Sequence, residues 1–342
     1  MINRLVWMET DNTYPYRNLA MEEYMTLHVP RGTCILYLWQ NRHTVVIGKN
    51  QNCWRECRVN FLEQENGYLV RRLSGGGAVF HDLGNLNFTF IVGAGDYDVS
   101  RQLDVILEAV RSLGIHAEKT GRNDITVDGR KFSGNAFYRT GDGCYHHGTI
   151  LIRADKENMS RYLNVSKEKL ASKGVTSVKS RVANLCEFKP DITLEEVKSA
   201  LVEAFSKVYG QPAVRMEEGE LPQPDIDART EKFASWQWKY GRKIPFEYEM
   251  EKRFPWGNIQ IQFHVDKGMI QDVNVFSDAM DQEMIGMLAE QLKGCAYAEE
   301  DICRAVKAVG TDAFQAGEYT GADEPQSCRI KEDIMTLVRE SL

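Results

Sequence analysis

The chain has 342 residues, 43% of them hydrophobic and 27% charged, a composition typical of folded globular proteins. Its formal net charge is −7 and it has no run of five or more basic residues, so it lacks the electrostatic footprint of a nucleic-acid-binding protein. No stretch approaches the roughly 18 consecutive apolar residues of a membrane span, and the N-terminus lacks the apolar region of a secretory signal. We therefore expect neither nucleic acid nor membrane as a partner.

The eight cysteines are scattered along the chain rather than grouped at conserved-looking spacings. In a long chain without a signal, this pattern predicts reduced thiols in the cytoplasm and not a disulfide framework. Cys53 and Cys57 have no second pair to match them, so no structural metal site is expected.

Hydrophobic periodicity predicts the first elements. Helical spacing of apolar residues favours a helix over 18–29, and short apolar runs predict strands over 44–48 and 86–92. A second amphipathic helix is expected from about residue 100, with Gly114 suited to its C-terminal end.

The stretch DITVDGRKFSGNA, residues 124–136, is typical of two strands joined by a tight turn at Asp128-Gly129. Residues 146–152 predict another strand. There His146 and His147 are neighbours and point to opposite faces, so they cannot both bind one metal ion.

Thr193 and Glu196 form a capping-box pattern, which predicts a helix that runs to about Tyr209 and ends at Gly210. Residues 211–232 then become polar and proline-containing. We interpret them as a surface excursion that is also a candidate domain boundary.

The C-terminal region has a self-contained pattern. Alternating apolar residues predict a strand over 259–265, followed by a turn at 266–268 and a second strand over 269–276. An apolar stripe over 280–292 predicts a helix that ends at Gly294, and its methionines are interpreted as core. The fold expected is a large mixed α/β domain (1–248) with a small C-terminal α+β domain (249–342).

The stretch RRLSGGGAVFHDLGN, residues 71–85, carries the first chemical signal. Its glycines match neither a P-loop nor a dinucleotide-binding motif. They predict a loop whose backbone N–H groups face an anion, with Arg71 and Arg72 before it. The alternative is a tight turn in which glycine only permits a positive φ.

The predicted hairpin carries the second signal, because its tight turn brings Asn123 and Asp124 opposite Lys131. The lysine can donate to a phosphate or carboxylate, and Asp124 can hold a divalent cation. A solvated surface lysine remains the alternative. The residues alone indicate a nucleotide or acyl-phosphate enzyme.

Several motifs in one register resemble the bacterial lipoate–protein ligase A family: RRLSGGGAVFHDLGNLNFTF, GRNDITVDGRKFSGNAF, HHGTILI and KGVTSVKSRVANL. The likeness continues through SWQWKYG into RFPWGNIQIQFHVDKG and so covers nearly the whole chain. It implies a catalytic domain with the fold of biotin–protein ligases. It also implies an ATP- and Mg²⁺-dependent reaction in which lipoate becomes lipoyl-AMP. The lipoyl group then passes to a lysine of a lipoyl domain of 2-oxoacid dehydrogenase complexes or of the glycine-cleavage H protein.

The resemblance also implies the site residues. Lys131 is the catalytic lysine that bonds the lipoyl carbonyl oxygen and the phosphate, and Asp124 lies in the Mg²⁺ region. The residues implied to bind lipoate, ATP or lipoyl-AMP are Arg72, Ser74, Gly75, Gly76, Gly77, Ala78, Val79, Phe80, Asn123, Asp124, Lys131, His147, Gly148, Thr149, Ser180 and Val182. The last two belong to the segment 173–182, which in the family folds over the adenylate. Trp39 is a candidate wall of the lipoate tunnel.

Two alternatives stay open. An ATP-independent lipoyl or octanoyl transferase would use a cysteine nucleophile, but residues 116–124 contain none and Cys144 lies on the other side of Lys131. A non-catalytic lipoate- or nucleotide-binding relative would bind without turnover, which the retained Lys131 and glycine loop argue against. The C-terminal domain favours the ligase. We expect a monomer, because no long apolar stripe is left over.

Overall fold

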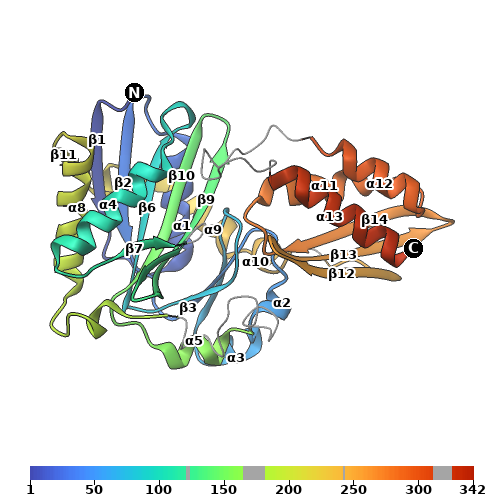
Figure 1. Cartoon of the computed structure of the whole chain (residues 1–342), viewed down its shortest axis with the longest axis horizontal. Helices are drawn as coiled ribbons and strands as arrows, with labels where there is room; N and C mark the ends of the chain where they lie inside the picture. Colours follow the sequence, from blue (N-terminus) through green and yellow to red (C-terminus); the bar gives the residue numbers. More distant parts are fainter. Residues whose placement is uncertain (121–123, 165–181, 242, 311–325) are drawn as a thin grey trace. The chain divides into compact units, whose positions relative to one another are not determined.

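The computed structural model describes residues 1–120, 124–164, 182–241, 243–310 and 326–342, and Figure 1 traces the chain. These residues form two compact units. Unit 1 comprises Met1–Val46, Trp54–Arg71 and Ala78–Lys239, and unit 2 comprises Ile47–Cys53, Arg72–Gly77 and Tyr240–Leu342. The predicted domain limit at residue 248 stays a prediction. No local pattern in the sequence indicates that two short N-terminal segments belong to unit 2.

Unit 1 is built on an eight-stranded mixed sheet with the order β11-β1-β2-β6-β10-β9-β8-β7. The first strand pairs in parallel with β2 and β11, and the remaining pairs are antiparallel. Its strands are β1 (Arg4–Glu9), β2 (Thr33–Trp39), β6 (Asn85–Gly93), β7 (Glu118–Thr120), β8 (Asp124–Val127), β9 (Arg130–Thr140), β10 (Gly143–Leu151) and β11 (Ala213–Arg215). This sheet and its helices confirm the mixed α/β class.

One face of this sheet packs on α4 (Val99–Ser112) and α8 (Leu194–Tyr209), as Figure 1 shows. Both helices were expected. The Thr193–Glu196 capping box is present, and Gly210 ends α8 in the left-handed region with φ +71°. The opposite face contacts α1 (Pro15–Leu27), which in turn packs against α9 (Gln223–Ala234).

Smaller elements complete unit 1. The strands β4 (Tyr68–Arg71), β3 (Thr44–Ile47) and β5 (Val79–His81) form a second sheet in that order; the last residue of β3 belongs to unit 2. The short helices are α2 (Cys53–Glu56), α3 (Val59–Gln64), α5 (Lys156–Tyr162) and α10 (Trp236–Tyr240), with 3₁₀ turns η1 (Ala94–Asp96), η2 (Leu185–Glu187) and η3 (Glu218–Glu220). Cys53 of α2 and Tyr240 of α10 belong to unit 2.

Residues 211–232 lie mostly at the surface, as interpreted, and Leu221 and Ile226 are their only buried members. The stretch is nevertheless structured and belongs to unit 1, since β11 extends the large sheet and α9 begins at Gln223. Pro224 is compatible with α9, because it lies in the first turn, where a missing N–H costs no hydrogen bond.

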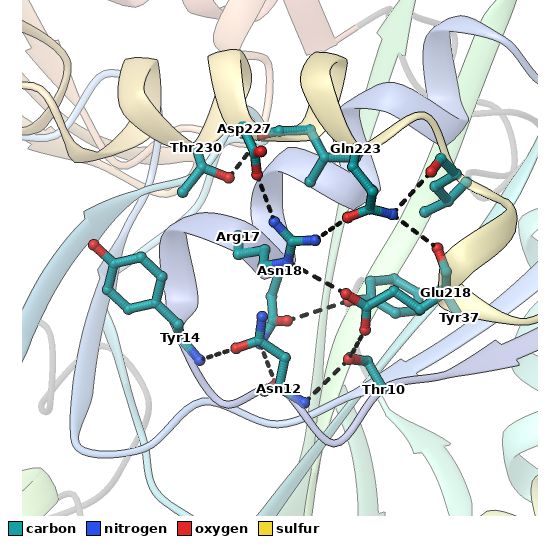
Figure 2. Close-up of polar contacts among 12 residues, drawn as sticks. Thr10, Asn12, Tyr14, Arg17, Asn18, Tyr37, Glu218, Gln223, Asp227 and Thr230 are labelled. Atoms are coloured by element: carbon teal, nitrogen blue, oxygen red, sulfur yellow. Dashed lines mark hydrogen bonds and ion pairs between the residues drawn. The ribbon is translucent and has the colours of Figure 1, made fainter.

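A polar cluster fastens this segment to the start of α1, and we call it the Arg17 cluster (Figure 2). The Arg17 guanidinium lies 3.2 Å from Glu218 and 2.8 Å from Asp227, and it also donates to Gln223. Thr10 donates to the second Glu218 oxygen at 2.5 Å. These contacts join segments about 200 residues apart in the chain.

Unit 2 is an α+β fold, as expected, with a three-stranded antiparallel sheet in the order β12-β13-β14. Its elements are β12 (Tyr248–Phe254), β13 (Gly257–Asp266), β14 (Met269–Ser277), α11 (Gln282–Leu292), α12 (Glu299–Ala308) and α13 (Gln326–Ser341). The methionine stripe is core: Met284, Ile285, Leu288 and Leu292 are buried. Met280 precedes the helix, since Asp281 is its N-cap.

Candidate functional site

The glycine loop curls around Arg72 within unit 2. The Arg72 guanidinium donates to the Ser74 hydroxyl at 3.0 Å and to the carbonyl oxygens of Gly75 at 2.6 Å and Gly77 at 2.9 Å. Gly76 has φ +88°, a conformation that favours glycine. The buried guanidinium therefore fixes the shape of the loop.

Gly75 of this loop and Gly48 also allow close approach of other backbone. A Cβ on Gly75 would lie 2.4 Å from the Ala279 carbonyl oxygen and 2.6 Å from that of Met280. The Gly76 N–H donates to Ala279 at 3.0 Å, and a Cβ on Gly48 would lie 2.2 Å from the Gly76 oxygen. The loop is thus built into unit 2, which explains part of its glycine content without any ligand.

Arg71 binds a different part of the chain from Arg72. Its guanidinium donates to the carbonyl oxygens of Trp238 at 2.9 Å and Lys239 at 2.8 Å, at the end of α10. The Trp238 indole donates back to the Arg71 carbonyl at 2.8 Å. Arg71 anchors a helix, and the sequence analysis did not anticipate that role.

Ala78, Val79 and Phe80 continue the loop into β5 of unit 1. The buried Phe80 ring stacks on Tyr162, with 5.3 Å between ring centroids. Its side chain is therefore part of the core of unit 1.

The hairpin of β8 and β9 brings Asp124 and Lys131 together, as its turn predicted. Asp128 and Gly129 have φ +49° and +72°, the left-handed values that a tight hairpin turn needs. The Lys131 Nζ lies 2.5 Å from the Asp124 Oδ1, and these side chains are only 22% and 19% exposed. The pair is a partly desolvated charge centre on unit 1.

The end of the Lys131 side chain lies directly against the backbone of Gly134. A Cβ at this position would lie 2.6 Å from the Lys131 Nζ and 2.7 Å from its Cε. Thr149 lies opposite Gly134 on β10, and its Oγ1 accepts the Gly134 N–H at 3.3 Å. A Cβ on Gly148 would lie 2.6 Å from the Gly134 oxygen, so the strands tolerate no side chain there either.

Val182 is joined to the same lysine through the backbone. It forms a parallel bridge with Lys131, and the following Ala183 N–H donates to the Lys131 carbonyl at 2.8 Å. The predicted residues Asn123 and Ser180, with the rest of 173–181, lie outside the described residues.

His147 takes part in a buried polar chain that sequence reasoning missed. Its Nδ1 lies 2.8 Å from the Glu22 Oε1, which also accepts the Thr89 hydroxyl at 2.7 Å. Thr89 in turn accepts the Trp39 indole N–H at 3.0 Å. A signal did exist: Asn18, Glu22 and Thr26 recur every four residues in the predicted helix, and all three are buried.

The other face of β10 carries Cys144 and His146. Burial, then the neighbouring His147, lowers the pKa of His146 to about 3, so this imidazole is neutral at physiological pH. Burial raises the pKa of the Cys144 thiol to about 11. Cys144 packs in the core between the sheet and the helices α4 and α8, so it lies on the opposite face of the sheet from His147 and Thr149.

Fold and site together define a two-domain α/β protein with a lysine–aspartate centre on its main sheet. Residues 14–206, more than half of the chain, match the family model described as the lipoyl protein ligase A/B catalytic domain. Residues 243–321 match the bacterial lipoate protein ligase C-terminus. The chain therefore belongs to the lipoyl protein ligase A/B family.

Solved structures agree with this assignment. LipL1 of Plasmodium falciparum, in complex with lipoate, is 28% identical with a TM-score of 0.80, and the match covers 97% of this chain and 99% of that one. A bipartite lipoate protein ligase of Thermoplasma acidophilum, described with its E2 lipoyl domain, is 26% identical with a TM-score of 0.61. That match covers 71% of this chain and 99% of the other. A lipoate–protein ligase A bound with ATP shares the fold at 24% identity and a TM-score of 0.60, over 70% and 99% of the two chains.

The described residues contain no group of three or more histidine, cysteine, aspartate or glutamate side chains that could hold a metal ion. None of their helices has the length and apolarity needed to cross a membrane.

Proposed function

We propose that this chain is an ATP-dependent lipoate–protein ligase. In the first half-reaction a carboxylate oxygen of lipoate attacks the α-phosphorus of ATP, forming lipoyl-AMP and releasing pyrophosphate. In the second, the amine of an acceptor lysine attacks the acyl carbon, forming the amide, losing a proton and releasing AMP. The observation that carries the proposal is the Lys131–Asp124 pair, in a chain whose two regions both match lipoate ligase families.

Lys131 suits the role of electrostatic catalyst in both steps. Negative charge grows on the phosphate and on the acyl carbonyl oxygen, and a fixed ammonium stabilises it most where water is excluded. The ion pair with Asp124 and the contact with the Gly134 backbone both restrict the position of the Lys131 ammonium. Lys131 therefore enters the reaction already oriented.

Arg72 and the loop from Ser74 to Phe80 are proposed to line the adenylate, with His147, Gly148, Thr149 and Val182. In the structure Arg72 serves by shaping the loop, because its donors engage the loop's own oxygens. The loop's backbone N–H groups other than that of Gly76, which donates to Ala279, would then face the anion.

Mg²⁺ fits this chain as a partner of the nucleotide. Magnesium in such sites is held by one or two carboxylates together with substrate phosphates, so a cluster of three protein ligands is not required. The Asp124 carboxylate is the proposed protein ligand, with Asn123 as its neighbour. The bound ion would neutralise phosphate charge.

Cys144 and Cys34 give the transferase alternative no support. A cysteine nucleophile reacts as the thiolate, and burial raises the pKa of Cys144 to about 11 and that of Cys34 to about 12. The acceptors proposed are lipoyl domains and the glycine-cleavage H protein. We also retain the predictions of a monomer and of a cytoplasmic location.

The test is lipoate-dependent ATP–pyrophosphate exchange with purified protein, Mg²⁺ and no acceptor. We expect label exchange that requires lipoate, followed by mass-detected lipoylation of an added lipoyl domain. Folded protein that transfers lipoyl groups from a carrier without ATP would refute the proposal.

A further inference from the structure

A straight row of residues crosses four strands of the large sheet on one face. The register places Trp39 of β2 opposite Asn87 of β6, Asn87 opposite Thr149 of β10, and Thr149 opposite Gly134 of β9. Directly opposite residues of antiparallel strands point to the same face. The Lys131 ammonium lies over Gly134, so the row runs from the proposed catalytic charge to the Trp39 indole.

Asn87 is the member of this row whose side-chain hydrogen bonding is incomplete within the described residues. Its side chain is 1% exposed, and its Nδ2 has no hydrogen-bond partner within the described part of the chain. Its Oδ1 accepts the Asn85 amide at 3.0 Å, and the Asn85 Oδ1 also lacks a partner there. Exchanging nitrogen and oxygen in both amides would keep one bond and still leave one donor and one acceptor unsatisfied. Buried polar groups are rarely left so, which points to a ligand.

The spacing of the strands indicates which part of a ligand would reach this amide. Neighbouring strands lie about 4.8 Å apart, so Asn87, two strands from Gly134, lies roughly 10 Å from the Lys131 end of the row. With bonds of about 1.5 Å in an extended chain, the sulfurs of lipoate lie roughly 8 to 10 Å from its carboxyl carbon. An acyl carbonyl held at Lys131 would thus place its dithiolane ring near Asn87 and Trp39.

We propose that Asn87 is a specificity-determining residue whose side-chain amide donates to a ring sulfur of the lipoyl tail. This inference rests on the proposed function, since it assumes that the acyl carbonyl lies at Lys131. Divalent sulfur accepts hydrogen bonds weakly, whereas a saturated hydrocarbon tail accepts none. Octanoate, with the same number of carbons and no sulfur, would leave the buried amide unsatisfied. Asn87 therefore favours lipoate over octanoate by penalising the plain fatty acid.

The experiment measures dissociation constants of lipoate and octanoate by calorimetry, without ATP, alongside pyrophosphate exchange with each acid. Asn87→Leu keeps the approximate size of the side chain and removes both polar atoms. We expect it to reduce the preference for lipoate about tenfold, with octanoate binding tighter and lipoate weaker. Ser133→Ala is the matched control. Its hydroxyl is also buried and has no hydrogen-bond partner among the residues that the structure describes, but it lies one residue from Gly134 and therefore on the opposite face of β9. This variant should keep the wild-type ratio.

The outcomes separate the two proposals. Wild-type protein that binds both acids but exchanges no pyrophosphate refutes the proposed function, while the binding ratio still tests Asn87. An unchanged ratio in Asn87→Leu, or a wild-type protein that binds neither acid or prefers octanoate, overturns the inference. If Asn87→Leu does not fold, Asn87→Ala is expected to change the ratio in the same direction.

Discussion

Replacing Gly134 by alanine tests whether the position of the Lys131 ammonium, and not only its charge, drives adenylation. The new methyl carbon would lie 2.6 Å from the lysine Nζ and 2.7 Å from its Cε. Ordinary van der Waals contact begins near 3.4 Å. The ammonium must therefore move by about 1 Å, and a displacement of this size can reduce a rate by up to roughly 10²-fold. The strand itself should persist, because Gly134 is not among the glycines with positive φ.

The assay is single-turnover formation of lipoyl-AMP in a double-mutant cycle. We expect Gly134→Ala to lower the rate by roughly 10- to 100-fold in the wild-type background. In a Lys131→Ala background it should have little further effect, because the two residues act through one contact. Ser133→Ala and the thermal midpoint of each variant serve as controls. Equal effects of Gly134→Ala in both backgrounds, or a rate within twofold of wild type, would refute the reasoning.

Three other predictions concern the fold and the loop. Arg17→Ala should lower the free energy of unfolding in urea by about 2 kcal/mol, since it removes hydrogen bonds between charged groups. The control Arg4→Ala, at an exposed position, should change this free energy little. Equal changes in the two variants would contradict a stabilising role of the Arg17 cluster. Gly75→Ala should abolish pyrophosphate exchange, because the backbone carbonyl of Ala279 cannot retreat as a side chain can; wild-type exchange would contradict this. The folded pKa of His146, about 3, lies below its ordinary 6.5, so its stabilising effect is present above pH 6.5 and is lost as pH falls towards 3. The stability difference between wild type and His146→Gln should therefore shift by up to about 1.4 kcal/mol per pH unit in this window, and a pH-independent difference would count against it.

Local patterns predicted the parts of the fold that local chemistry determines. Strand β6, the hairpin turn at Asp128-Gly129 and the capping box at Thr193 lie where periodicity, turn residues and caps placed them. Each depends on residues a few positions apart. The same reasoning missed β11, whose three residues form a strand only because β1 offers a parallel partner about 200 residues earlier.

The candidate site divides in the same way. The meeting of Asp124 and Lys131 was predictable, since one tight turn separates them. The packing of Gly75 on Ala279 was not, because nothing in either stretch reveals a contact across 200 residues. The sequence identified Asn87 only as one of the polar residues that alternate with apolar ones in a predicted strand. Its place in a row with Trp39 depends on the pairing register of β2, β6 and β10, which the sequence does not encode locally.

The dipeptide Arg71-Arg72 links two bodies of the molecule at a single peptide bond. Each guanidinium binds at least two carbonyl oxygens, Arg71 at the end of α10 in unit 1 and Arg72 inside the glycine loop of unit 2. A lysine at either position could not reproduce this planar, multiple contact. A deletion of one residue just before the pair would move Arg72 into the place of Arg71 and leave the carbonyl oxygens of the glycine loop without an arginine. The exact position of the two arginines in the sequence is therefore under tighter constraint than their positive charge.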